Sequence, residues 1–555
     1  TRNNRSFTER NNDLYLNMNK NFGTDGEISF SGLLGYNQRR SSFQSIYAST
    51  NGGLVVPGVY ALSNSQAAPA APSESANQIG VDGIYGQASF GYRNFLYLDV
   101  SARQDVSSTL PVENNTYFYP AASLSFIWSE FVDSDMLSFG KLRANWANVG
   151  SDAPANALVD AYGIGTPFNG VTLASAPSTQ NNANLLPENT QSTELGLEVK
   201  MFKNRLGFDI SSYNRVTENQ ILPAQVSSAT GTYYKYVNAG RVDNNGLEVS
   251  AYVTPVKTKD FQWDVNINWS TNDNTVVELF GDSESLLLGS VQGGVQMTAR
   301  VGEAYGTLEG TTFVRDGGTG APLVYDWASS RGGARYYTGE SGVIGNVQAD
   351  WRGGINNAFS YKNVRLSALI DMQMGGDFFS LDTYYGYGTG VYDFSAGTNA
   401  AGNPIRSNVE DGGGLTWDEV AHLGIEGVRQ WDGTTLDADG NPSGTTENTT
   451  PMWMNDYGNV LGWALGGPKE MHIHDASFVK LREVALTYTL PTSALGDLPI
   501  AGVDVSFVGR NLAILWKNTP YSDPEAGLSA GNLQGYQSGA YPTLREVGVN
   551  LRVKF

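Results

Sequence analysis

The chain ends in the stretch from Tyr541 to Phe555, which alternates between apolar and polar positions without a break from Glu546 to its last residue. Because successive side chains of a β-strand point to opposite faces, this stretch has one apolar and one charged face. Such a strand fits a soluble sandwich, whose apolar face meets a second sheet, or an outer-membrane barrel, whose apolar face meets lipid and whose polar face lines a wet lumen. The apolar positions are Val547, Val549, Leu551, Val553 and Phe555.

The same two-faced pattern recurs along the chain and predicts about fifteen strands. Its clearest example is 261–270, which reads Phe-Gln-Trp-Asp-Val-Asn-Ile-Asn-Trp-Ser, and its weakest is 302–313, within a Gly-rich region. The predicted strands cover 13–20, 27–36, 83–92, 95–104, 122–129, 142–146, 194–201, 206–213, 247–254, 261–270, 302–313, 349–361, 364–374, 477–490, 503–514 and 544–555.

The connections between these strands alternate between tight turns and long loops. Turns are expected at 23–26, Arg93–Asn94, Lys203–Asn204 and Asn363, and long loops at 37–79, 150–189 and 375–475, the last with a short helix near 417–423. This asymmetry is typical of an outer-membrane barrel, which has short periplasmic turns and long extracellular loops. The strand connections of a soluble sandwich do not need to alternate between short and long in this way. Amphipathic rings near strand ends fit the lipid interface. They are Tyr92, Trp128, Trp146, Trp269 and Tyr488.

Amino-acid composition excludes further classes of protein. The chain has 555 residues, no Cys, a formal charge of −20 and a charged fraction of 16%. It contains no apolar run of about 18 residues, which excludes a helical membrane span, and its first residues do not form a signal peptide. We therefore expect the first residue to be an interior point of a longer precursor. Lys and Arg do not cluster, which argues against a nucleic-acid partner.

No constellation of residues points to an enzyme, a metal site or a cofactor. The three histidines, His422, His472 and His474, lie in the longest loop region and lack a third ligand at a convincing spacing. The motif Asp437-Ala-Asp439-Gly-Asn441 resembles a calcium loop, but its Gly comes too early and no Glu occupies the bidentate position, so we expect a solvated turn.

Two groups of side chains are candidates for binding. Aromatic residues in the longest loop could stack on a substrate, or they could pack the loops together or against a partner. These are Tyr384, Tyr385, Tyr387, Trp417, Trp431 and Trp453. Charged residues at polar strand positions are expected to hydrate the lumen or to hold a plug by salt bridges. These are Asp99, Arg103, Arg143, Glu194, Glu198, Asp209 and Glu248.

Several motifs follow one another in a family-specific order. They are Ser477-Phe-Val-Lys-Leu-Arg-Glu-Val-Ala-Leu-Thr-Tyr-Thr-Leu-Pro491, Gly509-Arg-Asn-Leu512, Asp523-Pro-Glu525 and Tyr541-Pro-Thr543, preceded by Leu142-Arg-Ala-Asn-Trp-Ala-Asn-Val-Gly150, Leu186-Pro-Glu188 and Val242-Asp-Asn-Asn-Gly-Leu-Glu248. In these motifs and in their order, the chain resembles the barrel of SusC/RagA-type TonB-dependent transporters. The resemblance covers most of the chain.

The resemblance implies a 22-stranded transmembrane antiparallel barrel with an N-terminal plug, a TonB box and a SusD-like surface lipoprotein as partner. Residues 1–555 then correspond to the C-terminal portion of the barrel, 375–475 to a long extracellular loop region, and Phe555 to the C-terminal aromatic used in barrel insertion. The plug and roughly seven strands are expected upstream, because open strand edges are too costly in lipid.

The function that follows is TonB-dependent import, across the outer membrane of a Gram-negative bacterium, of an oligosaccharide or peptide too large for porins. The implied partners are the lipoprotein, the TonB complex, the chain's own plug and lipid. A scaffold barrel within a larger envelope complex has the same strand pattern, and a secreted β-rich adhesin is a third alternative. The sequence does not identify the substrate.

Overall fold

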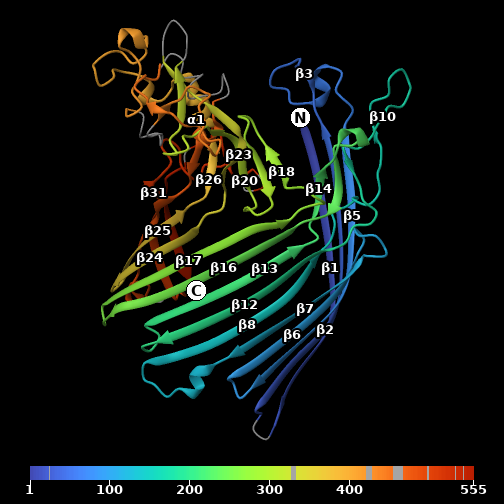
Figure 1. Ribbon diagram of the computed structural model, residues 1–555. Helices are drawn as coiled ribbons and strands as arrows, with labels where there is room; N and C mark the ends of the chain where they lie inside the picture. The colour runs from blue at the N-terminus through green and yellow to red at the C-terminus, as the bar shows by residue number, and fades with distance from the viewer. Residues whose placement is uncertain are drawn as a thin grey trace. The chain divides into compact units, whose positions relative to one another are not determined.

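The computed structural model describes residues 1–555 apart from 24–25, 327–332, 420–427, 454–466, 497–498, 530, 532 and 542. Within the described residues, fifteen long strands form one antiparallel sheet whose order follows the chain, as expected for an all-β protein (Figure 1). No helix of the described part is long and apolar enough to cross a membrane. The chain divides into two compact units, Thr1–Leu247 with Val276–Glu284, and Glu248–Thr275 with Ser285–Phe555.

The first unit consists of long antiparallel strands with small elements in the loops. Its long strands are β1 (Arg2–Phe22), β2 (Ile28–Ala48), β5 (Ser73–Tyr92), β6 (Leu96–Ser107), β7 (Thr116–Phe126), β8 (Leu137–Ser151), β12 (Glu188–Met201), β13 (Leu206–Glu218) and the first part of β16 (Arg241–Lys257). Its short elements are β3 (Asn51–Leu54), η1 (Leu62–Asn64), β4 (Ser65–Ala67), η2 (Trp128–Phe131), β9 (Gly163–Ile164), β10 (Ala174–Ser175), β11 (Thr179–Gln180), β14 (Ile221–Gln225), η3 (Ser228–Thr230) and β15 (Tyr234–Asn238).

The second unit combines six long strands with a large body of folded loops. The long strands are β17 (Phe261–Glu278), β24 (Trp351–Tyr361), β25 (Val364–Met374), β30 (Phe478–Thr489), β31 (Gly502–Lys517) and β33 (Glu546–Lys554). The loop elements are β18 (Ser285–Ser290), β19 (Gln296–Arg300), β20 (Thr307–Phe313), β21 (Leu323–Asp326), β22 (Ala334–Tyr336), β23 (Thr338–Asn346), β26 (Asp377–Ser380), α1 (Leu381–Thr389), η4 (Asp393–Ser395), η5 (Val409–Asp411), β27 (Arg429–Gln430), β28 (Thr446–Glu447), η8 (Lys469–His472), β29 (Ile473–Asp475), η9 (Thr492–Ala494) and β32 (Tyr536–Gln537).

The tight turns lie where the sequence predicts them. Arg93 and Asn94 have φ angles of 47° and 59° between β5 and β6, and Lys203 has a φ of 56° between β12 and β13. Two successive residues with positive φ twist a short hairpin in the same sense as its strands, which favours Asn at such positions. The predicted turn at 23–26 includes residues 24–25, outside the described part.

The predicted long loop at 37–79 is too long at both ends, because the connection between the two strands covers only 49–72. Strand β2 continues to Ala48 and β5 begins at Ser73, so that 37–47 pairs with 73–83 over its whole length. These segments are rich in Ser, Asn and Gln and lack the apolar alternation that marks a half-buried strand. Their ladder is held by backbone hydrogen bonds, which do not depend on apolar side chains, and polar side chains on both faces are expected where a strand extends beyond lipid.

Two local predictions also need correction. Trp128 does not end a strand, because β7 stops at Phe126 and Trp128 opens the short helix η2. The short helix expected near 417–423 lies largely outside the described residues, and of that range the structure shows only a turn that begins at Trp417, while a helix that the sequence did not predict, α1, spans Leu381–Thr389. The predicted strand at 302–313 begins only at Thr307.

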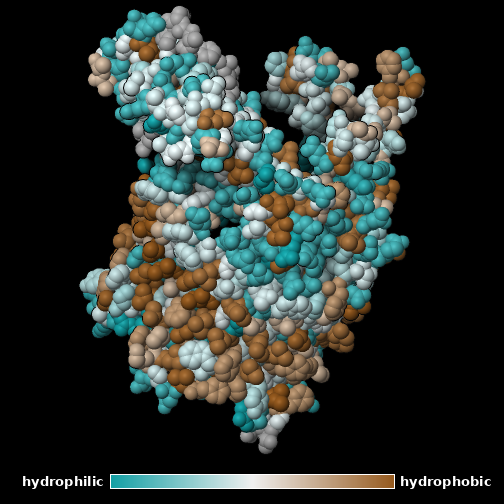
Figure 2. All heavy atoms as spheres, in the orientation of Figure 1, coloured by the Kyte–Doolittle hydropathy of each residue, from teal (hydrophilic) through white to brown (hydrophobic). Residues whose placement is uncertain are grey.

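The long strands expose one apolar face. In the first unit, Leu34 and Ile84 are 61% and 62% exposed, and in the second unit Val549 and Leu551 are 66% and 64% exposed. On β2 and β5 this apolar belt covers 28–36 and 84–92, which matches the roughly 9–11 residues of a transmembrane strand. Figure 2 shows the apolar surface as brown atoms over the strands facing the viewer. Within the described chain, no second protein layer covers it, as the barrel interpretation requires.

Candidate substrate-binding loops

The loops of the second unit pack around two hydrophobic clusters of their own. The first cluster joins Val324, Tyr387, Trp417 and Met452, from segments far apart in the sequence. The second joins Met297, Leu308, Phe379, Tyr384 and Tyr536. Long loops need such cores to hold one conformation, because an ordered loop loses chain entropy that contacts must offset. The loop region is therefore a folded body and can present side chains in fixed positions.

Helix α1 places three of the predicted aromatic residues. Ser380 caps its N-terminus by accepting a hydrogen bond from the Thr383 backbone N–H at 3.1 Å, and Gly390 ends it with a φ of 66°. Tyr384 and Tyr387 are 7% and 1% exposed and belong to the two clusters, while Tyr385 is half-buried beside Tyr384. The two buried rings therefore hold the loops together, the alternative that the sequence left open.

Trp417 and Trp453 are also buried and offer no free ring face. Trp417 packs edge-on against Tyr336, with 5.0 Å between ring centroids, and donates its Nε1–H to the Thr450 carbonyl at 3.0 Å. Trp453 is 6% exposed. Burial with a satisfied donor, as at Trp417, is usual for indoles in a core. Of the six predicted residues, only Tyr385 and Trp431 keep exposed surface.

Trp431 lies in a partly exposed row of three aromatic rings. Its ring centroid is 5.1 Å from that of Tyr337, whose ring is 4.8 Å from that of Tyr325. The Trp431 Nε1–H donates to the Thr435 carbonyl at 2.8 Å, which fixes the indole. Sequence reasoning missed Tyr325 and Tyr337, because 94 residues separate Tyr337 from Trp431. We call Tyr325, Tyr337 and Trp431 the aromatic row.

A lysine and two histidines are buried beneath α1. The Lys469 Nζ lies 4.7 Å from the centroid of the Tyr384 ring and 3.3 Å from its hydroxyl, and burial lowers the pKa of this lysine. Thr383 Oγ1 lies 3.3 Å from His472 Nδ1 and 3.1 Å from His474 Nε2. Burial lowers the pKa of His474 to about 4, so its imidazole is neutral at pH 7. His422 lies outside the described residues.

The Asp523-Pro-Glu525 motif anchors the loop between β31 and β33 to strand β30. Lys480 Nζ lies 2.5 Å from both an Asp523 and a Glu525 oxygen, and Arg482 contacts Glu525 at 2.9 Å and Asp371 at 2.5 Å. Burial acts to raise the pKa values of Asp523 and Glu525, but hydrogen bonds from Lys480, Arg482 and Thr543 hold both below their ordinary values. The motif is thus a structural clamp, a role that sequence alone did not assign.

The charged strand residues of the first unit mostly pair with one another. Arg143 contacts Glu194 at 3.1 Å and Asp209 at 2.7 Å, and Glu198 lies between Lys141 at 2.8 Å and Lys200 at 2.9 Å. All of these pairs except Glu198–Lys200, which lies within β12, join different strands, and they lie on the face opposite the apolar belt, which is the hydrated face expected of a lumen.

The remaining predicted charges are less tightly held. Arg103 pairs with Asp105 at 2.8 Å and donates to Asn37 at 3.2 Å. Asp99 is half-buried, and Glu248, in the second unit, is exposed. Phe555 is exposed at the end of β33. Whether any of these residues contacts a plug remains a prediction.

The loop motif at 437–441 forms a hydrogen-bonded turn. The Asp437 Oδ1 atom accepts from the backbone N–H of Asp439 at 2.9 Å and of Asn441 at 2.8 Å. An aspartate that accepts from the backbone two residues on is a common turn-forming arrangement. Over the described ranges, no group of three or more His, Cys, Asp or Glu side chains could hold a metal ion.

Comparison with known proteins gives consistent matches. The family model described as "TonB dependent receptor-like, beta-barrel" matches residues 1–342. TonB-dependent receptor P3 of Formosa agariphila is 24% identical over 99% of this chain and 53% of its own length. TonB-dependent receptor SusC of Bacteroides thetaiotaomicron is 26% identical over 36% of this chain and 21% of its own.

The fold resembles that of a solved transporter. The structure of the RagAB peptide transporter superposes with a TM-score of 0.74 at 18% identity, covering 100% of this chain and 56% of the solved one. The RagAB peptide importer in its closed-closed state gives a TM-score of 0.73 at 19% identity. The chain spans about half the length of the curated relatives it matches.

Proposed function

The chain belongs to the TonB-dependent receptor-like β-barrel family, and from this premise we propose that it is the C-terminal barrel portion of an energy-coupled importer. Members of this family are outer-membrane proteins rather than enzymes, and this chain shares that location and class. The proposed cargo is an oligosaccharide or peptide too large for porins. A plug and further strands from the same polypeptide complete the proposed barrel, because edge strands in lipid must be paired.

The observation that carries the proposal is the folded loop body of the second unit, whose long strands also expose an apolar face. A scaffold barrel has no need for loops that pack around two hydrophobic clusters of their own and carry a partly exposed aromatic row. Rigid loops at the mouth of a barrel are suited to selecting a ligand before transport.

The import proposal is tested with the whole receptor in its native host. Cells that carry the receptor are expected to accumulate labelled oligosaccharide or peptide cargo only while the proton gradient and TonB are intact. Removal of the receptor gene should abolish that uptake, and the gene supplied on a plasmid should restore it. Uptake that persists without TonB, or growth on every candidate cargo without the receptor, would contradict the proposal.

A SusD-like surface lipoprotein is proposed as the partner of the loops. Three observations support this partner: the sequence similarity to SusC, the similarity in fold to the RagAB transporter, and the folded loop body. When the full receptor is affinity-purified in mild detergent, one lipoprotein is expected to co-purify with it at a fixed ratio of lipoprotein to receptor. A receptor that purifies alone and still imports cargo would show that this part of the proposal is wrong.

The aromatic row is the proposed cargo contact within the loops. Trp431→Ala should weaken cargo binding about tenfold, since a stacked aromatic contact contributes about 1–1.5 kcal/mol. Trp431→Phe should recover most of the affinity. The matched control is Tyr541→Ala, which removes a ring that is 93% exposed elsewhere in the loops. Binding of labelled cargo to the purified receptor measures the effect, and equal losses in the Trp431 and Tyr541 variants would contradict the assignment.

A further inference from the structure

The aromatic row presents ring faces to a ligand, while hydrogen-bond donors of its side chains are already in use. The Trp431 Nε1–H donates to the Thr435 carbonyl at 2.8 Å, and the Tyr337 hydroxyl donates to the Trp431 carbonyl at 3.3 Å. The rings of Tyr337 and Trp431 are inclined at 66°, and those of Tyr325 and Tyr337 at 53°. A ligand on this row therefore meets the faces and edges of rings more than polar groups.

The turn that follows Trp431 holds the indole in place. Asp432 Oδ1 accepts from the Thr435 backbone N–H at 2.8 Å, and Asp432 Oδ2 accepts from the Thr435 hydroxyl at 2.5 Å. Gly433 has a φ of 82°, and an added Cβ there would lie 2.9 Å from the Tyr337 hydroxyl oxygen. The turn thus positions Thr435, whose carbonyl accepts from the indole, and leaves room for Tyr337 against the backbone.

Asp432 also places a negative charge beside the row. Hydrogen bonds from the side chain and backbone of Thr435, and from the backbone of Thr434, lower the pKa of Asp432 to about 2, so its carboxylate is ionised at pH 7. The pKa of Tyr337 is raised, mainly by burial and further by the nearby Tyr325 and Asp432. The charge of Asp432 therefore acts on the rings of the row.

The cations of the same small sheet do not offset this charge at the surface. Arg335 on β22 is only 5% exposed, and Arg429 on β27 donates to the Thr445 hydroxyl at 2.6 Å and to the Thr445 carbonyl at 2.8 Å. The wider loop sequence has the same sign, since 285–350 and 375–476 together contain 21 Asp and Glu but only 7 Lys and Arg. Such an excess repels an anionic ligand and leaves a neutral one unaffected.

We propose that the aromatic row binds the C–H face of an uncharged sugar ring, so that the cargo is a neutral oligosaccharide. A sugar ring presents C–H groups on its flat faces, which suit the electron-rich faces of aromatic rings, and keeps its hydroxyls at the rim, in water. An extended peptide would need partners for its main-chain N–H and C=O groups, and the donors of Trp431 and Tyr337 are already in use. A uronate or sulfate group would lie beside Asp432. The inference rests on the proposed import function and selects between the two cargo classes named there.

The test measures binding to the full-length receptor purified in detergent. The probes are neutral fragments of glucan, mannan and galactan, the same fragments carboxylated at C6, and peptides of similar length. At least one neutral fragment should bind, and its carboxylated form should bind about tenfold more weakly, because two like charges then lie close together. Added salt should reduce this difference, since exposed charges are screened.

Two results would overturn the inference. One is the absence of binding to every neutral fragment, and the other is tighter binding of a peptide or of a carboxylated form. Energy-dependent and TonB-dependent uptake of such a peptide or acidic fragment would leave the import proposal intact, so the two proposals fail separately.

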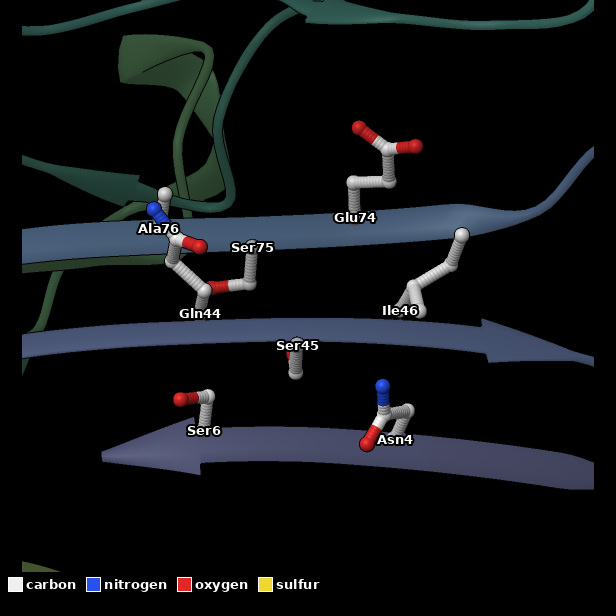
Figure 3. A pocket seen from close by; sticks show the side chains of 8 residues that line it. All are labelled: Asn4, Ser6, Gln44, Ser45, Ile46, Glu74, Ser75 and Ala76. Carbon is white, nitrogen blue, oxygen red and sulfur yellow. The ribbon is translucent and has the colours of Figure 1, made fainter.

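Variants assign the charge selection to Asp432. Asp432→Asn keeps an oxygen that accepts from the Thr435 N–H but removes the charge, so the ratio between the neutral and carboxylated affinities should fall several-fold. The matched control is Glu74→Gln, which removes one charge from a hollow of the first unit. Figure 3 shows this hollow, where Ser6, Gln44 and Glu74 lie on neighbouring strands and no labelled side chain carries an aromatic ring. An unchanged ratio in Asp432→Asn, or an equal fall in Glu74→Gln, would show that Asp432 does not select the cargo.

Discussion

Replacement of Lys480 with methionine is expected to release the loop between β31 and β33 and to destabilise its attachment by about 3–5 kcal/mol, the usual effect of breaking a buried ion pair. The side chains of Lys480 and Asp523 are only 5% and 8% exposed and lie 2.5 Å apart. Without the ammonium group, the Asp523 carboxylate keeps the hydrogen bond from Thr543 but loses its counter-charge. Limited proteolysis of the loop in the purified receptor measures the change.

The control for Lys480→Met is Lys141→Met. Lys141 also pairs with a carboxylate at 2.8 Å, but Glu198 keeps Lys200 as a second partner. Proteolysis of Lys141→Met should therefore match that of the unchanged receptor. Adding Asp523→Asn to Lys480→Met should restore part of the protection, because the buried charge is then removed as well. If the single Lys480 variant and the Lys141 variant are cleaved equally slowly, the motif does not act as a clamp.

The strand architecture could be predicted because its signal is local. Alternation of Val549 and Leu551 with Asn550 and Arg552 shows directly that one face of the strand is apolar and the other polar, and the Arg93–Asn94 pair indicates a tight turn. This alternation is lost at 37–47, where polar residues occupy both faces, although backbone pairing with 73–83 continues. Side-chain alternation therefore marked where the strands cross the apolar belt, and it could not show where they end.

The loop body could not be predicted to the same degree because its contacts are distant in sequence. Tyr387 and Trp431 are both aromatic residues of one Gly-rich region, yet the first is 1% exposed and the second remains partly open. What separates them is packing against Met471 and Tyr521 in one case and against Tyr337 in the other. Residue type alone cannot distinguish an aromatic ring that is buried in a hydrophobic core from one that stays partly exposed.

Acidification is expected to weaken the loop body through His474. Its pKa is lowered to about 4 by burial in the folded loops, against about 6.5 in an unfolded chain. Between these values the unfolded loops bind a proton that the folded loops do not, so stability is complete above pH 6.5 and falls as the pH decreases toward 4. At about 1.4 kcal/mol for each pH unit, the loss approaches about 3 kcal/mol near pH 4.

Hydrogen exchange of the α1 amides, corrected for the intrinsic effect of pH, measures this loss in the purified receptor. His474→Gln keeps a hydrogen-bonding group within reach of Thr383 but does not titrate, so protection of α1 should become nearly independent of pH between 6.5 and 4.5. The Asp523 and Glu525 clamp has lowered carboxylate pKa values and keeps its charge in this range, so it should not contribute. An unchanged pH slope in His474→Gln would show that another buried group is responsible, since His474 would then have no part in the response.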